Sequence, residues 1–315
     1  MQPLYAWIRR LKVTLTSTKF KKQIVFGENH LRNEDDLYIE VNGYKYLSTL
    51  KDECVVKIKN LTLSEVVQII DGQFYDVKIE AGYKSTGLNT IFDGGVLYIS
   101  NEVDDRKSNT IIILCASKLI AKYGQNRLNL TMNSGINMYA AINFICKRAG
   151  IPKTNVSTQL KKQMLENITN VDNTVGSFLD KLCSDNASYI SNSDANSSDI
   201  LTIFDSKNAN RRVIKLKADN MILQSYPRLT VEGVNIVVMP TFNFMCGDVI
   251  KIDNSLIQIP VQSKEELSKN YGYYLDDEGF YMIFQMEYHL QNKGHNFSLQ
   301  LNCKARNLVS NFLGV

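Results

Sequence analysis

The clearest structural signal in the sequence is YDVKIEAGY at residues 75–83, followed by TIFDGGVLYIS at 90–100 and TIIILCA at 110–116. In the first segment apolar and polar residues alternate, which is the two-residue period of a half-buried β-strand. The second is rich in β-forming residues but contains Gly94-Gly95, which predicts a bulge or a close approach of another backbone. The third is almost wholly apolar and predicts a strand buried on both faces. Three such strands in succession favour a barrel or a strongly curved sheet.

Strand signals of the same kind precede residue 75. Short β-branched and apolar runs, separated by polar turn-like residues such as Asn42-Gly43, predict strands at 12–17, 23–26, 37–41 and 53–58. One helix interrupts them. Thr62 with Glu65 three residues later is a capping-box signature, and apolar residues then recur at helical spacing. The first part of the chain therefore predicts a β domain that carries a single helix.

The middle of the sequence changes character. Apolar residues at helical spacing from 138 to 149, followed by Gly150 and Pro152, predict a helix that stops at the glycine. A second helix is expected over 175–184 and a short strand over 200–204, and the residues between the two helices are polar and rich in Asn. We interpret residues 119–210 as a small α/β insert.

The β pattern returns from residue 211 onward. Strand candidates lie near Val213 and Leu216 and at 234–239, 249–252, 280–286 and 297–301. A long polar loop at 262–277 contains Tyr271, Tyr273 and Tyr274. The order along the chain is therefore β, then α/β, then β, and the expected fold class is mixed β with an α/β insert.

The charge of the chain does not favour direct nucleic-acid recognition. The 315 residues carry a formal net charge of +4, whereas a nucleic-acid binder usually concentrates its basic residues on one stripe. The densest basic run is Arg9-Arg10-Leu11-Lys12 followed by Lys19-Phe20-Lys21-Lys22. We interpret this run as a solvated strand and turn, with a phosphate or acidic-partner contact as the alternative. No specific nucleic acid is expected as a partner.

The cysteines and the N-terminus bear on the cellular compartment. Six single cysteines (Cys54, Cys115, Cys146, Cys183, Cys246, Cys303) form no C-x-x-C pair, and most lie in apolar runs, so we expect reduced core residues. This favours synthesis in the cytosol. Arg9 and Arg10 follow the apolar N-terminal residues instead of preceding them, unlike a secretory signal. No stretch approaches 18 consecutive apolar residues, so no membrane anchor is expected.

The sequence contains no recognisable catalytic or metal-binding motif. His30, His289 and His295 lack Cys or carboxylate partners at metal-ligand spacing, and the acidic clusters at 35–36, 104–105 and 276–278 are placed where solvated turns are expected. P-loop, G-x-S-x-G and H-E-x-x-H motifs are absent. We therefore expect no catalytic, cofactor-binding or metal residues, no cofactor, and no enzymatic activity. The tyrosine-bearing loop either packs on itself or contacts a glycan or a protein.

Several motifs, taken in order, resemble the central baseplate hub proteins of contractile phage tails and the hub part of related injection machines. The resemblance rests on Gly82-Tyr83 followed by Phe92 and Gly95-Val96, on the helix at 138–150, and on a series from 223 to 252. That series reads Leu223-Gln224-Ser225-Tyr226-Pro227, Val231-Glu232-Gly233-Val234, Met239-Pro240 and Cys246-Gly247-Asp248-Val249-Ile250. Gly279 to Ile283 and Tyr288-His289 resemble the closing strands of the family. Cys246 stands where the family often has Pro, and the loop at 262–277 is longer than expected, which leaves the geometry of these loops open.

The resemblance implies two tube-like β-barrel domains, residues 1–118 and 211–315, flanking a small α+β domain at 119–210. It implies a homotrimeric, non-enzymatic hub that adapts a six-fold tail tube to a three-fold central spike around a channel. The implied partners are the tail tube protein, the central spike protein, and baseplate wedge or tape-measure proteins. The implied location is the baseplate of the virion tail, after assembly in the host cytoplasm. Strands 90–100 and 280–301 are expected to pair or pack across subunits.

Three other interpretations compete with this one. The chain could be a tail-tip or injection-system hub of another tail type, which would share the fold. A tail-associated cell-wall hydrolase would need a catalytic motif, and none is visible in the sequence. A glycan-binding module is indicated by the tyrosines at 271–274 alone.

Overall fold

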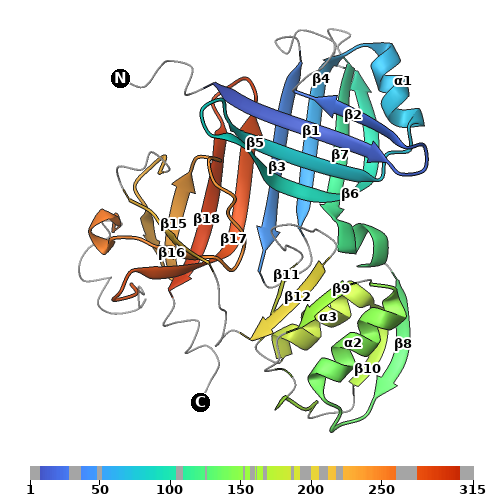
Figure 1. Cartoon of the computed structure of the whole chain (residues 1–315), viewed down its shortest axis with the longest axis vertical. Coiled ribbons are helices and arrows are strands. Elements are labelled where there is room, and N and C mark those ends of the chain that lie inside the picture. Colours follow the sequence, from blue (N-terminus) through green and yellow to red (C-terminus); the bar gives the residue numbers. More distant parts are fainter. Residues whose placement is uncertain are drawn as a thin grey trace.

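The computed structural model (Figure 1) shows a mostly antiparallel β protein with a small α/β part at one end. The structure describes residues 8–27, 37–47, 52–103, 109–124, 126–151, 153–156, 160, 162–165, 169–185, 188–191, 200–205, 212–217, 223–259 and 275–305. The expected order of β, α/β and β segments is therefore confirmed at this level.

A sheet of 13 strands contains strands from both β segments. Its main path runs β14-β15-β18-β17-β3-β4-β7-β6-β5-β1-β2, and β13 and β16 attach beside β17. The first segment supplies β1 (Arg9–Ser17), β2 (Lys22–Phe26), β3 (Tyr38–Tyr46), β4 (Glu53–Leu61), β5 (Asp76–Tyr83), β6 (Gly87–Val103) and β7 (Asn109–Ser117). The second supplies β13 (Val213–Lys215), β14 (Arg228–Thr230), β15 (Gly233–Val238), β16 (Val249–Lys251), β17 (Phe280–Gln291) and β18 (Phe297–Ala305), with a short 3₁₀ turn η6 (Asn254–Leu256).

The pairing of β3 with β17 joins the two β segments. Asn42 lies opposite His289 and Tyr44 opposite Glu287 in this antiparallel ladder. Buried residues of both segments accordingly form one core cluster, which includes Ile39 of β3 and Leu290 of β17. The strand path among the described residues stays open at both ends. Instead of two separate closed barrels, the described strands thus form one sheet, because β3 and β17 use each other as neighbours.

In the first segment the sheet folds back over itself. Figure 1 shows β1 and β5 crossing in front of β3, β4 and β7, and the core lies between these two layers. Strand β6 belongs to both layers, because it pairs with β5 only as far as Gly95 and with β7 from Gly94 onward. The strongly curved sheet expected for this region is confirmed, because β6 changes its partner from β5 to β7 near Gly94 and Gly95.

The helix α1 (Leu63–Asp71) begins where the capping signature predicted it. The Thr62 side chain accepts a hydrogen bond from the Glu65 N–H, and the Glu65 carboxylate accepts one from the Thr62 N–H at 2.7 Å. Val66 and Ile69 are buried against the core. The predicted capping box is confirmed in both directions.

The insert has its own elements and its own core. It contains a π-helical turn η2 (Ile120–Gly124), the helices α2 (Met138–Ala149) and α3 (Val175–Asp185), and the strands β8 (Arg127–Met132), β9 (Lys153–Val156), β10 (Thr169–Thr174), β11 (Ser188–Ser191) and β12 (Ile200–Asp205). Both helices were predicted, and α2 ends at Gly150 in the left-handed conformation as expected. The strands β8 to β11 were missed. β9, β10 and β11 are short or polar and lack a clear alternation, whereas β8 (RLNLTM) does alternate polar and apolar residues, a signal that was not used. The buried residues of this part form a second cluster, separate from the sheet core.

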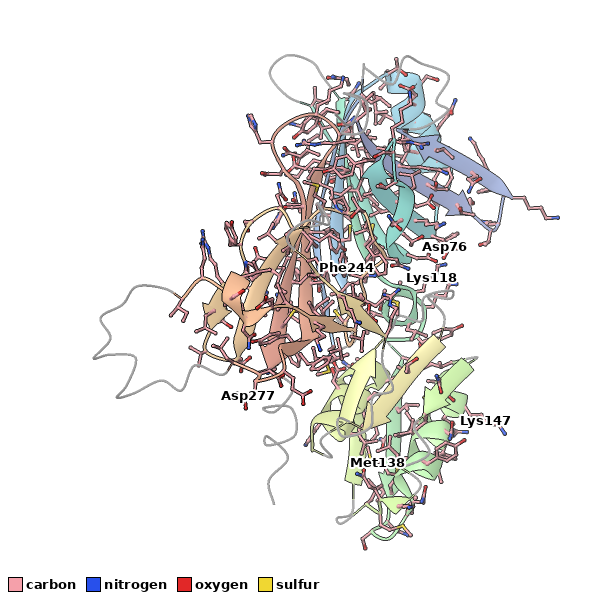
Figure 2. All side chains as sticks on the ribbon, turned by 60° about the vertical axis from the view of Figure 1, so that its left-hand side comes forward. Asp76, Lys118, Met138, Lys147, Phe244 and Asp277 are labelled. Carbon is pink, nitrogen blue, oxygen red and sulfur yellow. The ribbon has the colours of Figure 1, made fainter. Side chains whose placement is uncertain are left out.

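Ion pairs fix the first turn of the insert to the sheet. Lys118 contacts Asp93 at 2.8 Å, and Lys122 of η2 contacts Asp76 of β5 at 3.7 Å. Figure 2 shows Asp76 and Lys118 at the end of the sheet that faces the insert. Met138, at the start of α2, is fully buried within the insert core. The insert therefore has a defined junction and an independent interior.

Two glycine predictions had different outcomes. Asn42-Gly43 is not a turn and lies within β3. Glycine is required there because neighbouring groups occupy the space that a Cβ would fill. A Cβ on Gly43 would lie 2.4 Å from the Glu53 carbonyl oxygen and 2.5 Å from the Tyr288 hydroxyl. The close approach predicted at Gly94 is confirmed, since a Cβ there would lie 2.3 Å from the Ala116 carbonyl oxygen.

The prediction that β7 is buried on both faces is wrong. One row of its side chains, including Ile113, is buried, but Leu114 on the other face is 42% exposed. The apolar residues of this run alternate between two faces of β7. One face packs against the core, and the other is partly exposed in the single chain.

Candidate functional site: the polar face of the sheet

One face of the joined sheet is largely polar over β3, β17 and β18, whereas β4 and β7 add Val55, Ile112 and Leu114 to it. Side chains alternate between the two faces of a strand, so every second residue of the central strands points away from the core. We call this surface the polar face; its members are Tyr38, Glu40, Asn42, Tyr44 and Tyr46 of β3, Glu53 and Lys57 of β4, Gln285, Glu287 and His289 of β17, Ser298, Gln300 and Asn302 of β18, and Asn235 of β15.

Hydrogen bonds order the polar face across the junction of the two β segments. Asn42 donates to Glu40 at 2.8 Å, and its amide oxygen lies 3.0 Å from His289 Nδ1. The Tyr38 hydroxyl donates to the other oxygen of Glu40 at 3.4 Å. Residues that are about 250 positions apart in the sequence therefore share one network.

A second network lies beside the first. The Tyr44 hydroxyl donates to Glu53 at 2.6 Å, and the ring of Tyr44 meets that of Tyr46 edge to face at 5.2 Å. Gln285 donates to Glu287 at 2.8 Å and to the Tyr46 hydroxyl at 3.4 Å. The hydrogen bond that Tyr44 donates to Glu53 raises the pKa of Tyr44 to about 12, because the carboxylate favours the protonated phenol. These contacts hold the side chains of the polar face in place.

The loop before β16 ties the second segment to β3. Asp248 is buried and accepts hydrogen bonds from the guanidinium of Arg212 and from the Met245 N–H at 2.9 Å. Cys246 is also buried, and its sulfur donates to the Lys45 carbonyl oxygen at 3.4 Å. The Cys-Gly-Asp motif therefore has a structural role at the junction that supports the polar face.

The basic run at the N-terminus is used within the chain. Arg9 donates to the carbonyl oxygens of Gly294 at 2.6 Å and His295 at 3.3 Å, and its guanidinium lies 5.3 Å from the Phe297 ring centre. Lys12 forms an ion pair with Glu80 at 3.4 Å. This run therefore connects β1 to the β17–β18 turn and to β5.

The candidate metal and acid–base residues do not come together. In the described part of the chain no three His, Cys, Asp or Glu residues form a group that could hold a metal ion. His289 lies on the polar face, whereas His30 lies outside the described residues. Asp276 is not on a solvated turn as predicted, because it is buried and accepts backbone hydrogen bonds from Glu278 and Phe280. The acidic clusters at 35–36 and 104–105 and the tyrosines at 271–274 lie outside the described residues.

The described cysteines and tyrosines have the chemistry of structural residues. Cys54, Cys115, Cys146, Cys246 and Cys303 are free and buried. Burial raises the pKa of Cys303 and of Tyr288, and it raises that of Tyr281 to about 12. Each of these shifts moves the pKa of the group further above pH 7, whereas a general acid or base needs a pKa near the working pH.

An open cleft lies where β13, β16, the η6 turn and the turn before β17 meet. Its volume is about 520 Å³, and it is lined by Lys215, Leu216, Lys217, Lys251, Ile252, Asp253, Asn254, Asp277, Glu278 and Gly279. The lining mixes lysines with carboxylates and contains no nucleophile next to a base. Within the described residues, no helix is both long and apolar enough to cross a membrane.

A family profile described as baseplate hub gp41 matches residues 10–258, which is most of the chain and includes the β3–β4 part of the polar face. The chain belongs to this family. It is therefore a structural protein of the phage-tail baseplate, of the hub class, as the sequence motifs indicated. No curated protein matches the sequence.

Solved structures share the fold of this baseplate hub protein. A 43 kDa tail protein of prophage MuSo2 from Shewanella oneidensis aligns with a TM-score of 0.56 at 9% identity, over 95% of this chain and 98% of its own. The c3393 protein of the E. coli type VI secretion system, described as similar to the T4 tail proteins gp27 and gp5, gives 0.57 at 9% identity, over 85% and 73%. A chain of the Francisella PdpA–VgrG complex gives 0.54 at 10% identity, over 97% of this chain and 54% of its own. These likenesses establish the fold.

Proposed function

We propose that the chain forms a homotrimeric hub that adapts a six-fold tail tube to a three-fold central spike. In this proposal residues 1–118 and 211–315 are the two tube-like β domains, and residues 119–210 form the α+β domain between them. The supporting observation is the β3–β17 pairing, which brings two β segments of one chain into one sheet. Three such chains provide six β units around an axis, which is the number a symmetry adaptor needs.

The polar face is our candidate for the channel lining. Its hydrogen-bonded amides, phenols and carboxylates stay hydrated without offering a continuous apolar patch. Glu40, Glu53 and Glu287 lie on it near the β3–β17 junction, and Lys57 and Lys59 of β4 are the lysines beside them. Carboxylates disfavour binding of the phosphate backbone, so this composition suits a channel through which DNA passes without being retained.

We assign the peripheral contacts to the insert. Its separate core and its ion-paired junction allow it to project from the sheet as a unit. Baseplate wedge or tape-measure proteins are the proposed partners there, and the tube and spike proteins bind at the two ends of the ring. In this assembly, formed in the host cytoplasm, the chain acts through shape and interfaces and not through catalysis. A hub role in another tail type or injection system is the second candidate, favoured by the fold shared with the PdpA–VgrG chain.

Light scattering tests the trimer directly. The protein alone, and the protein co-expressed with the tube and spike proteins of the same tail, should have three times the 35.8 kDa chain mass per hub. Electron microscopy of the same particles should show a three-fold ring with a central opening. One or two copies per particle, in the presence of both partners, would contradict the proposal. In that event the hydrolase and glycan-binding alternatives would be tested with peptidoglycan and glycan arrays.

A further inference from the structure

The turn between β1 and β2 carries an exposed basic and aromatic cluster. It contains the second part of the basic run, Lys19-Phe20-Lys21-Lys22, and we call residues 18–22 the hairpin tip. All five residues of the tip are exposed, and the side chain of Phe20, between two lysines, is 53% exposed. Figure 1 shows this turn at the outer margin of the molecule, on the same side as α1.

The turn that follows α1 contacts the hairpin tip. The Lys19 ammonium donates to Gln73 Oε1 at 2.8 Å and lies 5.3 Å from the centre of the Phe20 ring. The Tyr75 hydroxyl donates to the same Gln73 oxygen at 3.5 Å, and the Tyr75 N–H donates to the Thr16 carbonyl oxygen at 3.1 Å. These contacts hold Lys19 in place and fix the base of the hairpin tip against the turn.

The backbone is unusual in both turns. Lys21 has a φ of +50° and Gln73 a φ of +45°. Asn60 is the one other non-glycine residue with positive φ in the described part of the chain, and Asn tolerates this conformation better than Lys or Gln. Tight hairpin loops that need a left-handed residue usually have Gly or Asn there. Lysine at a position that favours glycine indicates that the Lys21 side chain has a use outside the fold.

Structural roles account for only part of this cluster. β2 is an edge strand, and Lys22 at its start disfavours pairing with a foreign strand. Lys19 lies beside the residue that follows the C-terminal end of α1, where a cation is favourable. Neither role requires an exposed phenylalanine or a left-handed lysine. Within the described residues, Lys21 and Lys22 form no ion pair, so the chain leaves their charges uncompensated.

We infer that the hairpin tip is a docking site for an acidic surface of another baseplate protein. Phe20 is the apolar anchor of this contact, and Lys21 and Lys22 pair with carboxylates around it. An aromatic anchor with a charged rim is a common composition of protein contacts. Lysines that the chain does not neutralise are complementary to a carboxylate-bearing surface and accelerate its association. The inference uses the family membership of the chain and does not depend on the proposed trimer.

The small number of lysines and their fixed surroundings favour a protein partner over a lipid surface or a nucleic acid. Membrane surfaces and phosphate backbones are usually bound by larger sets of basic residues, whose exact positions matter less. The hairpin tip has three lysines, and one of them is already bonded to Gln73. A shaped protein surface makes use of a single positioned aromatic ring between two free cations.

Photo-crosslinking from position 20 identifies the partner and its chemistry. The photoreactive residue p-benzoylphenylalanine replaces Phe20 in cells that express the complete tail. We expect a covalent adduct with a second baseplate protein, at a peptide that contains Asp or Glu beside apolar residues. Lys21→Glu/Lys22→Glu in the same chain should abolish the adduct. Adducts on DNA, on lipid, on a second copy of this chain or on a peptide without carboxylates would contradict the inference, as would complete tails without any adduct.

Affinity measurements on the full-length chain test the role of each residue, with the cross-linked baseplate protein as the probe. Lys21→Gln/Lys22→Gln should raise the Kd about tenfold at low salt and reduce its salt dependence. Phe20→Ser should raise it about thirtyfold, whereas Phe20→Tyr should retain binding. Lys84→Gln/Lys293→Gln, at two exposed lysines of other turns, is the matched control and should leave the Kd unchanged. Equal effects of the two lysine pairs would contradict the inference.

Lys21→Gly separates binding from folding. Its thermal midpoint should stay close to that of the wild type, because relief of the left-handed strain offsets the greater freedom of glycine in the unfolded chain. Its Kd for the probe should still rise, by about threefold, since one charge of the contact is lost. Unchanged binding would contradict the role given to Lys21. Light scattering should give the same mass for all these variants as for the wild type, so failure of this inference is distinguishable from failure of the proposed trimer.

Discussion

At the residue scale, Tyr288 and Gly43 form the joint between the two β segments. Tyr288 is fully buried on β17, and its hydroxyl donates to the Glu53 carbonyl oxygen of β4 at 3.2 Å. Gly43 on β3, between these two strands, leaves the space that the phenol occupies. A buried hydroxyl without a partner would be costly, so the ring and its acceptor position each other.

Gly43→Ala tests this joint. Alanine normally stabilises a strand relative to glycine, but here its Cβ would overlap the Glu53 carbonyl and the Tyr288 hydroxyl. We expect a loss of about 1–3 kcal/mol in the free energy of unfolding, the usual cost of overpacking. Urea unfolding measures it, with Gln300→Ala on the polar face as the control. A neutral or stabilising Gly43→Ala would show that the joint is loosely packed.

Tyr44 provides a test of the polar face through its pKa. Its proton is held more tightly in the fold than in the unfolded chain, where the pKa is 10.0, and the folded value is about 12. The folded state therefore binds more protons between these values, so the stability contributed by the Tyr44–Glu53 hydrogen bond is complete below pH 10 and is lost as the pH rises towards 12. The tyrosinate absorbance of wild type minus Tyr44→Phe should titrate near 12, and Glu53→Gln should return it towards 10. Titration of Tyr44 near 10 in the wild type would mean that the contact does not form.

At the element scale, α1 packs against the sheet core next to β7. The capping box sets the start of α1, and the hydrogen bonds from the Asn109 side chain to Leu61 and from the Val96 N–H to Tyr75 fix the chain before and after the helix. Its outer side carries Leu63, Val67 and Ile70, which are exposed, while Val66 and Ile69 face the core.

Thr62→Ala tests the capping box. The substitution removes the acceptor for the Glu65 N–H, and we expect a loss of about 1 kcal/mol in the free energy of unfolding. Ser64→Ala, at an exposed position in the first turn, should change stability by less than about 0.5 kcal/mol. Chemical denaturation of the two variants compares them. Equal effects would indicate that the cap carries no special weight in the full chain.

At the scale of the whole molecule, the protein has two interiors. The sheet core draws buried residues from both β segments, and the insert core is separate from it. Two lysine–aspartate pairs, Lys118–Asp93 and Lys122–Asp76, connect the parts. Because such surface pairs contribute little to stability, the insert should unfold with considerable independence.

Paired core substitutions test this independence. Ile145→Ala in α2 and Ile113→Ala in β7 each remove a fully buried side chain, and each should cost about 2–5 kcal/mol. Calorimetry should show that Ile145→Ala lowers one thermal transition and Ile113→Ala the other. A single transition that shifts equally in both variants would mean that the two cores unfold as one.

The sequence by itself determined the local elements and the family. Alternation placed most strands of the two β segments, Thr62 and Gly150 marked helix ends, and the ordered motifs pointed to a baseplate hub, because these signals depend on neighbouring residues. The tertiary structure alone decided that Gly43 lies inside a strand, that β3 pairs with β17 to make one sheet, and that β6 changes its partner from β5 to β7 near Gly95. These features depend on contacts between residues up to about 250 positions apart. The alternation within a strand predicts that it is a strand, but it does not predict which other strand pairs with it. The polar face could therefore be recognised only after the strands were placed side by side.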